Sequence, residues 1–235
     1  MSGYGQFCPM AKATEIVGEK WTMLVLRELF MGTTRFNDFQ RALSRMSPTL
    51  LAKRLRRLED CGIIIRKKAS GQRGHEYRLT AAGKELGPLI EVLAIWGMRW
   101  ARSQLEDSEL DVEFLMRDLQ RQLHTDQLPD GETVICLIFD ELTEHKAWWL
   151  VINADNVDLC TENQGKEVDL YINSSVRTMV EIWSGDLDIH KALRNEKIKA
   201  NGSRHLIRTI QDWFGVCMYK DVSRGDPELM KLIAK

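Results

Sequence analysis

Four cationic side chains stand close together at Lys53, Arg54, Arg56 and Arg57, in the run MSPTLLAKRLRRLEDCGIIIRKK that covers residues 46–68. No acidic residue lies among them. Guanidinium and ammonium groups in such a setting suit contact with phosphate oxygens and with the acceptor atoms of guanine. An ordinary solvated helix face also carries such charges, so the surrounding elements must decide between the two interpretations.

This run has the features of a helix that is held down along one side. Ser47 is a good N-cap, and Pro48 falls at the first helical position, where its missing N–H costs nothing. Gly62 can supply the left-handed residue that ends a helix. The buried side is predicted at spacing i, i+4 and i+7 by Leu51, Leu55 and Leu58. A cationic helix of this kind has the shape of a recognition helix, and the predicted groove and phosphate contacts are Ser47, Thr49, Lys53, Arg54 and Arg57.

The neighbouring segments favour DNA binding. An apolar helix over 21–31 and a second helix beginning near Arg35 precede the cationic helix, which is helix-turn-helix order. Two predicted strands, 63–68 and 75–79, follow it as a basic hairpin, a "wing" placed to contact phosphate or the minor groove. The glycines of its tip lack the strand-to-helix context and the Lys-Ser/Thr pair of a P-loop. The predicted wing contacts are Arg66, Lys68 and Arg73.

The charge differs sharply between the two halves of the 235-residue chain. Residues 1–103 hold 18 Lys+Arg and 9 Asp+Glu, whereas residues 104–235 hold 15 and 25. The net charges are therefore +9 and −10. We predict a basic DNA-binding domain over 1–103 and an acidic domain with another task over 104–235. In the acidic half, short β-rich runs followed by short helices indicate an α+β fold.

Catalytic and metal chemistry find little support. The five cysteines are scattered and form no C-x-x-C pair, and the five histidines are isolated from one another. We expect no metal, no cofactor and no enzyme activity. The N-terminus lacks a secretory signal and no apolar run could span a bilayer, so we expect a cytoplasmic protein that does not enter membranes.

A long helix is predicted over 81–102, with a wide apolar face that includes Trp96 and Trp100. A winged helix domain does not need so much apolar surface for its own core. We expect this face to form a homodimer, since helix-turn-helix dimers read two-fold operators. Packing against the acidic domain is the alternative.

Residues 8–102 resemble the HxlR family of winged helix-turn-helix transcriptional regulators. The resemblance is carried by Cys8-Pro9, Gly18-Glu19-Lys20-Trp21-Thr22, Leu26-Arg27-Glu28-Leu29, Gly32, Arg35-Phe36, Phe39, Ser47, Leu51, Arg54-Leu55, Leu58, Gly62-Ile63-Ile64, Glu76-Tyr77-Arg78-Leu79-Thr80 and Gly83-Lys84. It implies a dimeric cytoplasmic regulator that dimerises through its last and first helices. In some members the cysteine matching Cys8 senses oxidants or electrophiles. Lys12, one turn on, could lower the pKa of such a thiol; a small residue buried at the dimer interface is the alternative.

The acidic half resembles the sterol carrier protein 2 (SCP2) fold, most closely over residues 168–202. The matching features are Trp183-Ser184-Gly185, Leu187-Asp188, Lys191-Ala192 and Lys197-Ile198, followed by Asn201-Gly202. The resemblance implies an antiparallel sheet covered by helices and an apolar cavity; a dry core is the alternative. Trp148 and Trp149 are adjacent on a strand, so they must point to opposite faces. The candidate pocket residues are Trp148, Trp149, Tyr171, Met179, Trp183, Leu206, Ile210 and Trp213.

These features together predict a homodimeric regulator that binds a double-stranded DNA operator, with a second domain that either senses a small apolar ligand or strengthens the dimer interface. One alternative is redox or electrophile sensing through Cys8, with an architectural second domain. Another is an SCP2-like lipid-binding protein whose winged helix makes protein contacts.

Overall fold

The computed structural model describes residues 3–69, 74–102, 105–226 and 228–229. Its contacts divide the chain into two units, Met1–Trp96 and Gly97–Lys235. The division lies inside a helix, a few residues before the boundary expected from the charge pattern. Each unit has its own apolar core.

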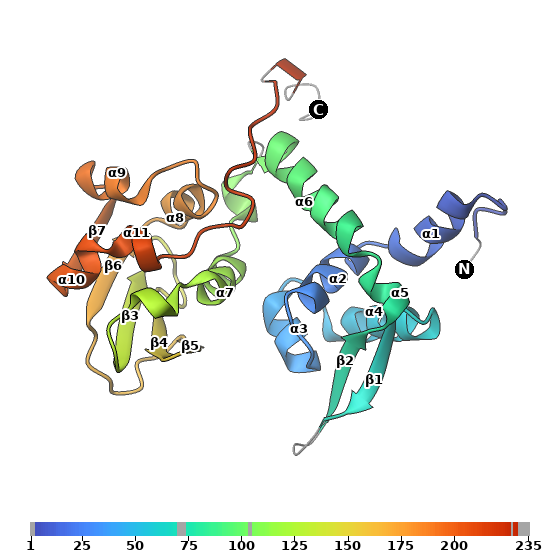
Figure 1. Cartoon of the computed structure of the whole chain (residues 1–235), viewed down its shortest axis with the longest axis horizontal. Helices are drawn as coiled ribbons and strands as arrows, with labels where there is room; N and C mark the ends of the chain where they lie inside the picture. Colours follow the sequence, from blue (N-terminus) through green and yellow to red (C-terminus); the bar gives the residue numbers. More distant parts are fainter. Residues whose placement is uncertain (1–2, 70–73, 103–104, 227, 230–235) are drawn as a thin grey trace. The chain divides into compact units, whose positions relative to one another are not determined.

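The first unit consists of helices and one β-hairpin (Figure 1). Its core is formed by side chains from three helices and the start of the hairpin, among them Val25, Leu26, Phe39, Leu55 and Ile64. The hairpin strands pair antiparallel, with Ile64 opposite Leu79 and Lys68 opposite His75. The elements in chain order are α1 (Pro9–Val17), α2 (Thr22–Phe30), α3 (Phe36–Ala42), α4 (Pro48–Asp60), β1 (Ile64–Lys68) and β2 (His75–Leu79).

The long helix expected over 81–102 is interrupted. It forms α5 (Ala81–Lys84), capped by the Thr80 side chain, and then α6 (Gly87–Trp100). Pro88 explains the break, because it has no N–H to donate to the carbonyl of Lys84 and its ring would clash with that carbonyl. The prediction of one continuous helix was therefore wrong at this point.

The second unit is a five-stranded sheet with helices (Figure 1). Two short 3-10 turns, Asp107–Glu109 and Thr125–Gln127, flank its first helix. The helices and strands are α7 (Val112–Gln122), β3 (Glu132–Ile138), β4 (Ala147–Asn153), β5 (Asn156–Cys160), β6 (Leu170–Ser174), α8 (Val176–Trp183), α9 (Ile189–Arg194), β7 (Ile198–Gly202), α10 (Arg204–Arg208) and α11 (Ile210–Trp213).

The sheet has the order β5-β4-β3-β6-β7, and it is mixed rather than purely antiparallel as expected. The chain runs through the β3-β4-β5 meander and then crosses to the other side of β3, so β6 pairs parallel with β3. The remaining pairs are antiparallel.

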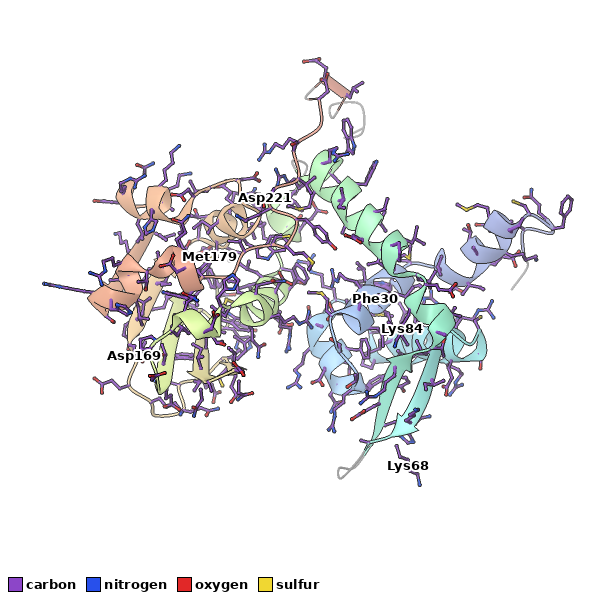
Figure 2. The ribbon with its side chains drawn as sticks, viewed as in Figure 1. Phe30, Lys68, Lys84, Asp169, Met179 and Asp221 are labelled. Carbon is purple, nitrogen blue, oxygen red and sulfur yellow. The ribbon has the colours of Figure 1, made fainter. Side chains whose placement is uncertain are left out.

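The core of the second unit lies on one face of this sheet. Ile135, Leu137 and Ile172 point into it and meet buried side chains from α7 to α11. Met179 of α8 is fully buried there and lies among the helices in Figure 2. No helix in the described part of the chain is long and apolar enough to cross a membrane.

Candidate nucleic-acid interface

Helix α4 is fixed to the first unit along one side. Leu51, Leu55 and Leu58 are at most 1% exposed, which confirms the predicted buried stripe. The Ser47 hydroxyl accepts a hydrogen bond from the Leu50 amide at 3.3 Å, and Pro48 begins the helix. Gly62 follows the helix with φ +70°, the left-handed conformation expected of it. The side chains of the opposite face are thus held on a rigid support.

The opposite face of α4 presents Thr49, Lys53 and Arg56, all exposed. Their spacing of i, i+4 and i+7 aligns them in one stripe. Within the described residues neither Lys53 nor Arg56 forms an ion pair. Arg57 is half-buried, and its Nε has no hydrogen-bond partner in the described structure. Arg56 was not among the predicted contact residues, although its spacing of three from Lys53 indicates the shared face.

Arg54 does not lie on the exposed face, contrary to expectation. The residue is only 8% exposed, and its guanidinium forms an ion pair with Glu19. Its Nε donates a hydrogen bond to the carbonyl of Lys20 at 3.0 Å. The position follows from helix geometry, since residue 54 lies three after Leu51 and four before Leu58 and therefore belongs to the buried side. Arg54 anchors α4 to the segment between α1 and α2.

That segment is under conformational strain. Trp21, at the N-cap of α2, has φ +78°, which is rare for a bulky residue. Two buried polar atoms in and beside this segment, Glu19 Oε1 and Thr22 Oγ1, have no hydrogen-bond partner in the described part of the structure. Strain and unpaired buried groups in one place persist only where the surroundings over-determine the conformation. The contacts of Arg54 with Glu19 and the Lys20 carbonyl hold this segment against α4.

The hairpin presents a second group of cations. Arg66 and Lys68 are exposed on β1, and Figure 2 shows Lys68 pointing outward at the end of this strand. Arg66 Nη2 lies 3.1 Å from His75 Nδ1, so the guanidinium is supported from the opposite strand. Arg78 Nη2 lies 2.7 Å from Glu76 Oε2, and this ion pair makes Arg78 less available for contact with a nucleic acid. The predicted contact Arg73 lies outside the described residues.

The eight predicted pocket residues are divided by the sheet of the second unit. Trp183 packs against the core face, and Trp149 and Tyr171 are cross-strand neighbours of Cys136 on the other face. The predicted group therefore does not surround a single space. The residues buried together in the core are Trp148, Met179, Leu206, Ile210 and Trp213.

Cys8 lies exposed at the N-cap of α1, and its side chain makes no capping hydrogen bond. Lys12, which was expected to assist it, instead places its Nζ 3.1 Å from the carboxylate of Glu15. This hydrogen bond lowers the pKa of Glu15. In the described part of the chain, no group of His, Cys, Asp and Glu side chains could hold a metal ion.

Comparison with known proteins places these features in a family. The model of the HxlR-like helix-turn-helix family matches residues 16–105. The HTH-type transcriptional regulator sll1512 of Synechocystis is 37% identical over 101 residues, which are 43% of this chain and 75% of that protein. This chain belongs to the HxlR-like family.

Two further relatives extend the comparison. The HTH-type transcriptional regulator Rv3095 of Mycobacterium tuberculosis is 46% identical over 89 residues, 37% of this chain. This HxlR-like chain spans 56% of the length of that protein. The solved structure of the redox regulator HypR in its oxidised form is 32% identical, and the match covers 38% of this chain and 94% of HypR with a TM-score of 0.36.

Proposed function

We propose that this HxlR-like protein is a sequence-specific DNA-binding transcriptional regulator. The observation that carries the proposal is the exposed stripe of Thr49, Lys53 and Arg56 on a helix whose opposite side is buried. In a helix-turn-helix the second helix enters the major groove, and its exposed side chains contact base edges and phosphates. Arg66 and Lys68 of the hairpin then contact phosphates or the minor groove beside it.

In this proposal Arg54 positions α4 and does not read DNA. Its guanidinium is committed to Glu19 and to the Lys20 carbonyl, so a base contact would break a buried ion pair. The groove contacts therefore come from Ser47, Thr49, Lys53, Arg56 and Arg57.

Operator binding can be tested on duplexes that the full-length protein selects from a random pool. We expect Arg56→Ala to lower affinity by about 1–3 kcal/mol if Arg56 reads a guanine, with specificity relaxed at one base pair. Lys53→Ala should weaken binding to all sequences. It should also make the slope of log affinity against log salt concentration less steep by about 0.9. Lys146→Ala, an exposed cation of the second unit, is the control. Unchanged affinity in both α4 variants would contradict the assignment.

We also propose that the protein is a homodimer through α6 and α1. Helix α6 exposes an apolar stripe at i, i+3, i+4 and i+7, formed by Leu89, Val92, Leu93 and Trp96, each 45–63% exposed. Helix α1 has no buried residue, and Met10 is 73% exposed. Apolar surface of this extent on two helices of one small unit is typical of a surface that another protein covers.

The dimer is tested by light scattering on the full-length chain. Leu93→Glu places a charge in the middle of the stripe and should yield monomers, whereas Glu91→Gln, off the stripe, should leave the dimer intact. A Leu93→Glu variant that remains dimeric and folded by circular dichroism would refute this interface.

A second candidate function is ligand control through the second unit, which we propose to be SCP2-like. Its support is a sheet with helices on one face, and one unusual group in the core. Trp148 is 4% exposed, and its Nε1 donor has no acceptor in the described structure. A buried unpaired donor is costly, and a ligand with an apolar body and one acceptor atom would satisfy it.

Titration with fatty acids and sterols, followed by thermal unfolding, tests this function. A rise in the unfolding temperature on adding a probe would support it if Trp148→Phe abolishes that rise, because phenylalanine keeps an aromatic ring but has no hydrogen-bond donor. Identical unfolding temperatures with and without these probes would favour a purely architectural second unit. Redox control through Cys8 remains the alternative signal, and its support is the exposure of the thiol.

A further inference from the structure

The charges of the second half of the chain are segregated. Residues 190–208 carry six Lys+Arg and a single acid, Glu196, whereas the rest of residues 104–235 carries nine Lys+Arg and 24 Asp+Glu. The net charge of −10 for the whole half therefore conceals a strongly basic segment.

This segment folds into adjacent elements. Helices α9 and α10 both contact β7, which is an edge strand of the sheet. Figure 2 shows side chains with nitrogen tips extending outward from α9 and α10. We refer to the six cations of these elements and their connections as the basic strip: Lys191, Arg194, Lys197, Lys199, Arg204 and Arg208.

The members of the basic strip are exposed and almost entirely without acidic partners. All six are exposed, and in the described structure only Lys197 reaches a carboxylate, that of Glu181 at 3.7 Å. Several cations elsewhere in this unit are paired, as Arg102 and Arg224 are with Asp186 at 3.1 and 2.8 Å. Ion pairing within the unit therefore does not account for the strip.

Two other roles for such cations fit poorly. Lysines on an edge strand prevent aggregation, but this would account for Lys199 and not for the cations of two helices. A membrane surface would require apolar side chains that insert beside the charges. The apolar residues of these helices, such as Ile189, Ala192 and Leu206, are instead buried in the core.

We propose that the basic strip binds the phosphate backbone of double-stranded DNA that flanks the operator. Residues 190–208 contain no Trp, Tyr or Phe on which a base could stack, so the contact is electrostatic and independent of sequence. The inference rests on the proposed DNA binding by the first unit, which brings the strip to a high local concentration of DNA because both units belong to one chain.

The test uses the full-length protein and two duplexes. One is trimmed to the selected operator, and the other carries about two further helical turns on each side, at ~10.5 base pairs per turn. Affinity is measured across a salt titration for the wild type and for Lys191→Gln/Arg194→Gln/Arg204→Gln/Arg208→Gln. The control is Lys146→Gln/Lys220→Gln, which removes exposed cations of the same unit outside the strip. Circular dichroism checks that each variant is folded.

We expect the wild type to show a steeper log–log salt slope on the long duplex than on the short one. The strip variant should lose this difference, at about 0.9 of slope for each phosphate contact removed, while the control variant keeps it. Equal slopes for wild type and strip variant on the long duplex would overturn the inference. So would a strip variant that binds DNA normally but no longer binds poly-glutamate, since the strip would then recognise an acidic protein. Failure of the proposed function is seen separately, as a wild type with no salt-dependent binding to the short duplex.

Discussion

Replacement of Arg54 by alanine separates a positioning role from a DNA-reading role. The Arg54 and Glu19 side chains are 10% and 24% exposed, so their ion pair is largely removed from water. Breaking a buried pair by removing one partner costs about 3–5 kcal/mol, and the partial exposure of Glu19 favours the lower end. The carbonyl of Lys20 also loses its charged donor. We therefore expect the first unit to be destabilised by about 3 kcal/mol.

Hydrogen exchange resolved by peptide is the appropriate assay, because it reports the opening free energy of α4 separately from that of the second unit. A double-mutant cycle with Glu19→Gln and Arg54→Met should give a coupling energy of about 1 kcal/mol or more. Arg56→Ala provides the contrast, with exchange in α4 unchanged and operator affinity reduced. If Arg54→Ala left exchange in α4 as in the wild type and still abolished operator binding, Arg54 would read DNA and the positioning role would be wrong.

Three further predictions concern thiols and one buried pair. A thiol reagent should modify exposed Cys8 in the folded protein, while buried Cys136 reacts only on unfolding, as mass spectrometry of the labelled peptides would show. Burial raises the pKa of Cys136 from 9.0 to about 11. The buried neutral thiol therefore contributes its full stabilisation below pH 9, and this contribution is lost as the pH rises toward 11. Denaturant titrations of the wild type and of Cys136→Ala at pH 8 and 10.5 check that the free energy of unfolding falls with pH only where the thiol is present. Trp183 Nε1 donates to buried Asp118 at 2.6 Å, so Asp118→Ala should cost about 1–3 kcal/mol by leaving the donor unpaired. An Asp118→Ala variant as stable to denaturant as the wild type would contradict this.

Much of the DNA-binding unit could be predicted because its signals are local. The cap at Ser47, the leucine stripe and the left-handed Gly62 all lie within one stretch of sequence, and the structure confirms each of them. The burial of Arg54 was also indicated by its spacing from Leu51. Its partner Glu19 is distant in the sequence, however, and only the tertiary fold brings the two together.

The second unit was less predictable because its organisation depends on distant contacts. The α+β character was accessible from the alternation of β-rich runs and short helices, and a local cap supports it: Asp188 begins α9 by accepting a hydrogen bond from the Lys191 amide at 2.8 Å. The parallel pairing of β3 with β6 depends on the side from which the chain returns, which no local pattern records. The candidate pocket was divided for the same reason, since Trp149 and Tyr171 share a face with Cys136 only through the strand register.

The parallel pairing of β3 with β6 also has a consequence for the order of folding. Ile135 of β3 pairs with Leu170, which lies 35 residues later in the chain. That edge of the central strand therefore stays unpaired until β6 has been synthesised. The first unit is built mainly from helices and a tight hairpin, which form early because their contacts are local. During synthesis from the N-terminus, α1 to α4 can therefore be complete while β3 still exposes an unpaired apolar edge. We expect that interval to be the period in which a nascent chain is most prone to aggregation.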